Sequence, residues 1–396
     1  MTSVDAGDTP GWLATPVESG LAAGFGIYLH VPFCHHRCGY CDFATVAVGD
    51  GDETLYDRYV AALSADIRRW AGQRQDWPEV SSIFLGGGPP TMVGASRLAA
   101  LVDDVRASFA CADDVEITVE ANPETGSVQL FEGLAAAGVT RLSMGAQSFV
   151  AHVLDRLERG HSTTRAAEAV EQARRGGIGD ISLDLIYGTP GESDDDWVTT
   201  LRALLDLEVD HVSAYALSIH ANTPFGQEVT AGTMRATDDD VLRDRFELTR
   251  QALVAGGFEH YEISNFARGP ARRSRHNQLY WRHGDYLGLG VGAHGHLDGR
   301  RWWTTRSIER YCDAIEQGID PAAGTETLSV DERAAERLML GLRVKEGLHP
   351  NDVPHLDPLA LEDAMKVGLI TTACGRLQAT ERGWYLLDDA VTRLMP

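Results

Sequence analysis

Basic residues are scarce in this chain of 396 residues. Lys and Arg together number 35, against 58 Asp and Glu, which gives a formal net charge of -23. Because nucleic acids and anionic membranes are themselves negatively charged, this excess argues against non-specific binding to either. We therefore expect no nucleic-acid partner, and only local basic patches could bind anions.

Long apolar runs are absent as well. No stretch approaches the ~18 consecutive apolar residues of a membrane span. Residues 1–24 contain no basic segment followed by an apolar run, so we expect a cytoplasmic protein without a signal peptide. Six cysteines in a chain of this length do not form a disulfide framework. Cys111, Cys312 and Cys374 are scattered singly, whereas the other three are clustered and need a metal or redox explanation.

The clustered thiols are Cys34, Cys38 and Cys41, directly after an apolar, strand-like segment. Thiolates at this spacing can hold three irons of a cubane cluster, because a short loop lets nearby sulfurs converge on one centre. The fourth iron is then open to a small molecule. A structural zinc site with His35 or His36 as fourth ligand, or ordinary buried thiols, are the alternatives. Zinc normally recruits ligand pairs from two separated segments, and no second pair is placed to match, which favours an iron-sulfur site.

The part of the chain from about residue 26 to residue 217 alternates short apolar, often β-branched runs with helical segments, which is typical of βα units around a parallel sheet. Six units are too few for an eight-stranded barrel, so we predict an α/β fold with a partial, three-quarter βα barrel. The predicted strands are Ile27–Val31, Ser82–Leu85, Glu116–Glu120, Arg141–Gly145, Ile181–Ile186 and His211–Ala216. The predicted helices include Leu55–Trp70, Ala95–Phe109 and Thr164–Arg175.

The domain organisation follows from where this alternation begins and ends. We predict a mobile N-terminal segment at 1–24, the partial barrel at 25–225, a barrel extension at 226–327, and a small helical, winged-helix-like domain at 328–396. The elements expected beyond the barrel are a helix near Asp238–Ala255, a strand at Tyr261–Phe266, a tight loop at Gly290–His296, helices at Asp331–Val344 and Leu359–Val367, and strands at Leu369–Thr372 and Leu377–Thr380. The tight loop is expected to pack against the cysteine loop, and no role is assigned to its histidines.

Polar and glycine-rich motifs lie at the carboxyl ends of the predicted strands, where parallel βα folds bind ligands. Glycines in the run Gly86-Gly87-Gly88-Pro89 let a backbone approach a ligand closely, although a tight turn is the alternative. Glu120, Gln147, Arg159 and Asp184 lie at or near the ends of successive strands, where a buried charge needs a partner. That partner is a bound ligand or an internal salt-bridge network.

One basic island interrupts the acidic chain. Arg272, Arg273 and Arg275 stand next to His276 and the aromatic pair Tyr280-Trp281. Haem would suit this segment, because arginine pairs with carboxylates, aromatic rings stack on porphyrin and a neutral imidazole can ligate iron. The segment alone favours the alternative, a solvated charge run with a histidine at the start of a helix.

Taken together, these residues resemble the radical S-adenosylmethionine (SAM) superfamily. Within it the chain is similar to the coproporphyrinogen III dehydrogenase-like group, nearest to the haem chaperones of the HemW family. The motifs cover most of the chain. They are His30-Val31-Pro32-Phe33-Cys34 with Cys38 and Cys41-Asp42-Phe43, the glycine triplet, Glu120-Ala121-Asn122-Pro123, Arg141–Gly145 with Gln147-Ser148-Phe149, Ser182–Gly188, Tyr261–Ala267 and His276-Asn277-x-x-Tyr280-Trp281.

The resemblance implies that Cys34, Cys38 and Cys41 ligate a 4Fe-4S cluster whose open iron takes SAM. In the family, the reduced cluster cleaves SAM to methionine and a 5'-deoxyadenosyl radical. The residues implied in SAM binding are Tyr28, Tyr40, Gly87, Gly88, Pro89, Glu120, Gln147, Arg159 and Asp184. The resemblance further implies haem as bound cargo, with His276 as its ligand, and delivery to acceptor haemoproteins, including a transient contact with membrane haemoproteins.

Two positions depart from the family pattern. Pro89 stands where the family usually has Thr, so a contact to SAM is lost and a lower SAM affinity is expected. Phe43 stands where true coproporphyrinogen dehydrogenases carry a further cysteine, which argues against the porphyrin-forming reaction and agrees with the chaperone branch. The alternatives are oxygen-independent coproporphyrinogen III dehydrogenase and a radical SAM haem-modifying enzyme.

Overall fold

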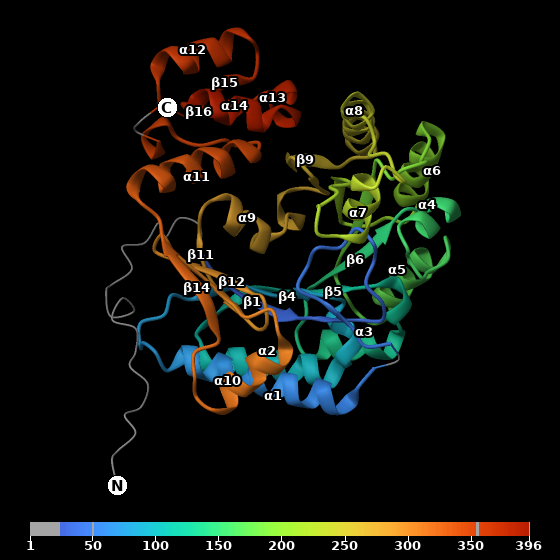
Figure 1. The fold of residues 1–396 in the computed structure, drawn as a ribbon, viewed down its shortest axis with the longest axis vertical. Helices are drawn as coiled ribbons and strands as arrows, with labels where there is room; N and C mark the ends of the chain where they lie inside the picture. The colour runs from blue at the N-terminus through green and yellow to red at the C-terminus, as the bar shows by residue number, and fades with distance from the viewer. Residues whose placement is uncertain (1–23, 50, 354–355, 396) are drawn as a thin grey trace.

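The computed structural model describes residues 24–49, 51–353 and 356–395. Its centre is one mixed sheet (Figure 1). The strands of this sheet are β1 (Phe25–Val31), β4 (Val80–Gly87), β5 (Cys111–Ala121), β6 (Arg141–Gln147), β7 (Asp180–Tyr187), β8 (His211–Ala216), β9 (Glu259–Glu262), β10 (Asn265–Ala267), β11 (Asp285–Leu289), β12 (His294–Leu297), β13 (Arg300–Thr304) and β14 (Ala322–Thr327). Their order across the sheet is β14-β13-β12-β11-β1-β4-β5-β6-β7-β8-β10-β9.

The six predicted strands are confirmed as β1, β4, β5, β6, β7 and β8, which pair in parallel and in chain order. The intervening helices are α1 (Glu53–Ala71), α2 (Ala95–Ser108), α3 (Val128–Ala136), α4 (Ala151–Arg156), α5 (Arg165–Arg175) and α6 (Asp194–Leu205). Helices α1, α2 and α3 cover one face of the sheet (Figure 1). The predicted α/β fold with an incomplete βα barrel is therefore confirmed, with β14 and β9 as the edges of the sheet.

Helix α1 shows how the sequence builds this outer layer. The side chain of Asp52 accepts a hydrogen bond from the Leu55 backbone N–H at 3.0 Å, which caps the start of the helix. Buried side chains then recur every three or four residues, so that they lie on one face of the helix, which packs on the sheet. Its buried residues include Tyr56, Tyr59, Leu63, Ile67 and Trp70.

The predictions for the glycine-rich tract were partly wrong. β11 is a further parallel strand beside β1, with Gly288 opposite Tyr28. The predicted tight loop at Gly290–His296 is correct only for its first part, because His294–Leu297 is strand β12. The physical reason is packing: a Cβ on Gly288 would lie 1.8 Å from the carbonyl oxygen of His294. Glycine here permits close approach within the sheet.

The predicted strand at Tyr261–Phe266 was also wrong in one respect. The chain turns back at residues 263–264, so that β9 and β10 pair in an antiparallel hairpin. The helix expected near Asp238–Ala255 is confirmed as α8 (Asp239–Ala255). The other helices before the C-terminal part are α7 (Pro224–Thr230), α9 (Arg275–Trp281) and α10 (Ile308–Glu316).

The four elements predicted in the C-terminal part are confirmed as α11 (Val330–Arg343), α12 (Pro358–Lys366), β15 (Ile370–Ala373) and β16 (Arg376–Ala379), whereas α13 (Glu381–Tyr385) and α14 (Leu387–Leu394) were not predicted. Their buried apolar side chains, such as Leu342, Leu369 and Leu394, form a cluster of their own. The division into domains stays a prediction, and the predicted mobility of 1–24 falls, apart from Gly24, outside the described residues. Within the described part of the chain, no helix is long and apolar enough to cross a membrane.

We predict that Gly288→Ala lowers the free energy of unfolding by about 3 kcal/mol, because the added methyl group meets backbone that cannot move without separating β11 from β12. Urea unfolding measures this change. Gly179→Ala is the control, since nothing lies within 4 Å of a Cβ at that position. Equal stability of the two variants would contradict the pairing of β11 with β12.

Candidate functional site

The cysteine loop follows β1 directly. Cys34 ends the short strand β2 (Phe33–Cys34), which pairs with β3 (Val46–Ala47), and the Val48 N–H donates to the Cys34 carbonyl at 2.9 Å. The loop is thus closed at its base, and the Cys41 N–H donates to the Cys38 carbonyl at 3.1 Å within it. All three thiols are free of disulfide bonds and line one cavity of ≈ 670 Å³.

Most of the residues singled out from the sequence line the same cavity. They are Cys34, Cys38, Tyr40, Cys41, Gly87, Gly88, Pro89, Glu120, Gln147, Arg159 and Asp184. They come from the ends of successive parallel strands or from the segments that follow them, as the rule for such folds predicts. Tyr28 and His276 are not among the lining residues.

Two of the thiols, Cys34 and Cys38, are buried enough to affect their ionisation. Burial raises the pKa of Cys34 to about 12 and also raises the pKa of Cys38, whose sulfur lies 3.8 Å from a guanidinium nitrogen of Arg159. Without a metal these groups are neutral thiols. A metal ion reverses that shift, because a coordinating thiol is deprotonated outright. The three thiols share the cavity with His35, His36 and Asp42, and among the described residues no three such side chains already form a metal-binding group. Thiolates are the usual ligands of iron-sulfur clusters, so the three cysteines remain the candidate ligands.

The glycine run packs against the cysteine loop. The Gly88 N–H donates to the Val31 carbonyl at 2.8 Å. A Cβ on Gly88 would lie 2.3 Å from the Phe33 carbonyl oxygen and 3.0 Å from the Cys34 sulfur. At Gly87 the backbone φ is +120, and a Cβ would lie 2.7 Å from the His30 ring. The close approach that the glycines permit is thus to the chain's own cysteine loop, at the wall of the cavity.

Two carboxyl groups lie deep in the cavity. Glu120 accepts a hydrogen bond from the Gly87 N–H at 3.0 Å, and Asp184 accepts one from the Ser143 hydroxyl at 3.3 Å. Burial raises the pKa of Glu120 to about 8, with a further contribution from Asp184, and burial raises that of Asp184 to about 6. A cationic ligand in the cavity would therefore stabilise the ionised form of both acids.

Arg159 does not neutralise these acids. Its guanidinium donates to the Asn122 side-chain oxygen at 2.7 Å and to the Gly145 carbonyl at 2.9 Å, on the side of the cavity next to Cys38. The internal salt bridge from Arg159 to Glu120 or Asp184, considered from the sequence, is not formed among the described residues. Burial is therefore the main influence on the pKa of Asp184, and the nearby charges of Arg141 and Arg159 offset only part of it.

Gln147 reaches the cavity through a backbone irregularity. The register between β6 and β7 shifts between Gly145 and Gln147, and Gln147 has a φ of 62. Positive φ is uncommon for a residue with a side chain and is often found at functional sites. A Cβ on Gly145 would lie 2.6 Å from the Gln147 side-chain nitrogen, so glycine leaves room for this side chain.

Tyr28 and His276 lie deeper in the barrel. The Tyr28 hydroxyl and His30 Nδ1 are 2.9 Å apart. His276 is 1% exposed, its Nδ1 is 2.9 Å from the Ser82 hydroxyl, and its Nε2 is 2.7 Å from the Tyr280 hydroxyl. Burial lowers the pKa of His276 to about 3, so the ring is neutral at pH 7. With both nitrogens hydrogen bonded, this imidazole has no ring nitrogen available to a ligand here.

The arginines around His276 are also engaged. Arg273 contacts Glu346 at 2.7 Å and Glu259 at 2.9 Å, and Arg275 contacts Asp114 at 2.8 Å. Arg272 lies 3.5 Å from Asp210 and 3.7 Å from Asp180.

Ser274 caps α9 by accepting a hydrogen bond from the Asn277 N–H at 3.2 Å. The alternative considered from the sequence was a solvated charge run with a histidine at a helix start. The histidine does lie in the first turn of α9, but the run is not solvated, because its arginines contact acids and Arg273 is buried.

Sequence reasoning missed one side of the cavity. The end of β8 and the loop after it contribute Tyr215, Leu217 and His220 to the lining. Tyr215, within β8, is 41% exposed, and Phe43 of the cysteine loop, which lines the same cavity, is 60% exposed. The rule that ligands bind at the carboxyl ends of parallel strands applies to β8 as to the others and could have identified these residues.

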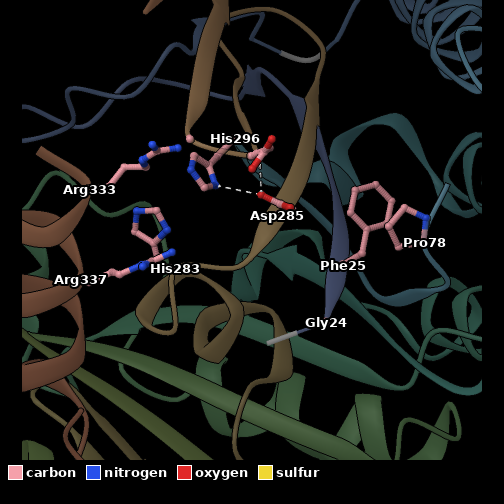
Figure 2. Close-up of a pocket in the computed structure, with 10 residues that line it drawn as sticks. Gly24, Phe25, Pro78, His283, Asp285, His296, Arg333 and Arg337 are labelled. Carbon is pink, nitrogen blue, oxygen red and sulfur yellow. Dashed lines mark hydrogen bonds and ion pairs between the residues drawn. The ribbon is translucent and has the colours of Figure 1, made fainter. Parts of the chain in front are cut away.

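A second cavity of ≈ 50 Å³ lies between β11, β12 and α11. Figure 2 shows His296 directed toward Asp285, with Nδ1 3.4 Å from the carboxylate, and Arg333 and Arg337 approaching from α11. Burial, followed by the neighbouring His296, lowers the pKa of His283 to about 4. A space of this volume holds a few water molecules at most, so the larger cavity is the candidate cofactor site.

We predict that Gly88→Ala prevents normal assembly of a metal centre at the cysteine loop, because the new methyl group would displace the Phe33 carbonyl and the Cys34 sulfur. Iron and sulfide content after anaerobic reconstitution, together with visible absorbance, measures the effect, and we expect a loss of more than about half. Gly179→Ala serves as the control. Full iron content in the Gly88 variant would contradict the role given to this contact.

Comparisons with known proteins agree with this geometry. The model of the radical SAM superfamily matches residues 28–204. A protein named "Heme chaperone HemW" from Mycobacterium tuberculosis (strain H37Rv) is 42% identical over 371 residues, which cover 94% of each chain. Its namesake from Escherichia coli is 39% identical over 92% of this chain and 96% of the relative. The solved coproporphyrinogen III oxidase HemN from Escherichia coli superposes with a TM-score of 0.77 at 22% identity, covering 94% of this chain and 90% of that one, which shows a shared fold.

Proposed function

Because this chain belongs to the HemW heme-chaperone family of the radical SAM superfamily, we propose that it binds haem and transfers it to acceptor haemoproteins. The observation that carries the proposal is Phe43. This side chain is 60% exposed at the cavity mouth. By the resemblance, it stands where coproporphyrinogen dehydrogenases carry a further cysteine. A porphyrin can stack on an exposed phenyl ring, which cannot supply the thiol.

We further propose that Cys34, Cys38 and Cys41 hold a 4Fe-4S cluster with SAM on its open iron. Three cysteines, and no fourth, line the described cavity, which supports this ligand set. When bound, the cluster supplies an electron for cleavage of the SAM sulfonium. The chain's own contribution is to hold the three thiolates in one closed loop and to limit water around them.

The SAM site proposed here is the inner part of the cavity. Glu120 and Asp184 can accept hydrogen bonds from the hydroxyl and ammonium groups of the cofactor, and its positive charge offsets the burial of these acids. Arg159 and Gln147 supply hydrogen-bond donors in the same cavity. The remaining residues assigned to SAM are Tyr28, Tyr40, Gly87, Gly88 and Pro89. Tyr28 lies beneath the cavity and would act through its neighbour His30.

His276 as haem ligand stays a prediction. Binding iron would require this ring to lose its hydrogen bond to Ser82 or to Tyr280 and to become accessible from 1% exposure. Each lost hydrogen bond of this kind costs about 1 kcal/mol, and more if the partner is left buried and unpaired. Haem binding through His276 therefore demands an opened form of α9.

We predict that Cys38→Ala abolishes the iron-sulfur absorbance, because two remaining thiols cannot hold a cubane open at one iron. Iron and sulfide analysis of the anaerobically purified chain measures the loss. Cys374→Ala is a matched control, since Cys374 is exposed and distant from the cavity lining. Retention of one tightly bound zinc ion instead of iron would contradict the assignment.

The proposed chaperone activity predicts that haem leaves the protein unaltered. Incubation of the haem-loaded chain with a haem-free acceptor, with SAM and a reductant present, should move haem to the acceptor with unchanged mass. The two enzymatic alternatives give different results in the same experiment. Conversion of added coproporphyrinogen III to protoporphyrinogen would indicate the dehydrogenase, and a methylated or ring-opened haem would indicate a haem-modifying enzyme.

A further inference from the structure

The kinds of side chain expected at a haem site are also found, accessible to solvent, at a second place in the chain. Haem needs an apolar surface for its ring, cations for its propionates and an imidazole for its iron. In the His276 segment the imidazole is buried and the arginines contact acids. At the mouth of the large cavity, the same three kinds of side chain surround Asp42-Phe43 and are open to solvent.

We propose that haem docks at this mouth, with its ring against Phe43 and Tyr215 and with His220 as the axial ligand of its iron. The inference rests on the proposed haem-binding function and adds the position of the cargo. We call the surface formed by Arg37, Phe43, Tyr215, Leu217 and His220 the mouth surface; each of these residues lines the cavity.

The apolar part of the mouth surface comes from two separate segments. Phe43 projects from the cysteine loop and is 60% exposed, and Tyr215 projects from the end of β8 and is 41% exposed. Leu217 continues the same wall. Large aromatic side chains normally bury most of their area, so two of them exposed within one cavity indicate a surface that a flat apolar ligand covers.

The position of His220 is fixed by its main chain. Its carbonyl accepts a hydrogen bond from the Thr223 hydroxyl at 2.6 Å, and a Cβ on Gly226 would lie 2.1 Å from the same oxygen. Helix α7, which these residues begin, is tied to the cysteine loop by the Phe225 N–H, which donates to the Gly39 carbonyl at 3.0 Å. The loop of His220 is thereby held next to that of Phe43.

The imidazole itself is available. The His220 side chain is 52% exposed, and its Nε2 lies 3.7 Å from a carboxylate oxygen of Asp42. At 3.7 Å this is a contact between oppositely charged groups and not a hydrogen bond. A small movement would let Asp42 accept a hydrogen bond from one ring nitrogen, as carboxylates do beside metal-binding imidazoles, and would leave the other nitrogen for the metal. Since Asp42 precedes Phe43 directly, this arrangement places the ligand beside the aromatic surface.

Two guanidinium groups supply the positive charge. Arg37 donates from Nη2 to the Cys41 carbonyl at 3.0 Å, and Arg306 donates from Nη2 to the Asp42 carbonyl at 2.8 Å. These partners are neutral carbonyl groups. Neither arginine forms an ion pair with an acid among the residues that the structure describes, so their charges can pair with the two carboxylates of haem.

The test compares porphyrins with and without iron. The reconstituted, cluster-loaded chain is titrated anaerobically with haem and with metal-free protoporphyrin IX, and binding is followed by difference absorbance and tryptophan fluorescence. For His220→Ala we expect about tenfold weaker haem binding and a shifted Soret band, with protoporphyrin affinity unchanged, because only the iron bond is lost. For Phe43→Ser we expect both affinities to fall.

The control is His152→Ala, which removes an imidazole of similar exposure, 60%, on α4. Wild-type haem affinity and spectrum in the His220 variant would overturn the mouth site. The same conclusion follows if His276→Gln, shown by circular dichroism to be folded, alone loses haem binding; the proposed chaperone function would survive that result. Failure of the unaltered chain to bind haem at all would instead refute the proposed function.

Discussion

The contact on which the site depends is the one between the glycine run and the cysteine loop. Parallel pairing of β1 with β4 brings Val31 opposite Gly87, and the Gly88 N–H then donates to the Val31 carbonyl at 2.8 Å. Because neither Gly87 nor Gly88 has a side chain, the backbone after β4 reaches the first cysteine within van der Waals distance. The loop that carries all three thiols is therefore positioned by the sheet itself, before any metal is bound.

The interior of the barrel has two layers, an upper one at the carboxyl ends of the parallel strands and a lower one at their other ends. Toward the carboxyl ends of the strands, Glu120 and Asp184 face an open cavity. Toward the other ends, α9 packs against β4 and β1, and His276 bonds to Ser82 on β4. The lower layer is closed by hydrogen bonds and aromatic contacts, such as the stacking of His276 on Phe84 at 5.1 Å. The ≈ 670 Å³ cavity belongs to the upper layer, whereas the cavity of ≈ 50 Å³ beside Phe25 and Asp285 lies at the other ends of the strands.

Much of this could be predicted from sequence. The six central strands were recognisable because parallel strands covered on both faces consist of apolar, β-branched runs, and the thiols were recognisable from their spacing. β11 was not, since Gly288 is explained only by the carbonyl of His294 against which it packs. The burial of His276 could not be predicted either. Its partner Ser82 is 194 residues away in sequence, and a local motif cannot indicate a contact of that kind.

The distribution of charge in the cavity gives a reason why one site could hold two ligands of opposite sign. Its interior carries Glu120 and Asp184, whose pKa values are raised mainly by burial, although the charges of Arg141 and Arg159 offset part of the shift at Asp184. Its mouth carries Arg37, with Arg306 beside it on Asp42. A SAM molecule with its sulfonium and ammonium groups is favoured inside, and a dicarboxylate porphyrin is favoured at the rim. Exchange of the two positions would place carboxylates against carboxylates in a region of low dielectric constant, which is strongly unfavourable. Under the proposed function, this distribution of charge would place the cofactor inside and the cargo at the rim, so that haem could leave from the solvent side while the cofactor stayed bound beneath it.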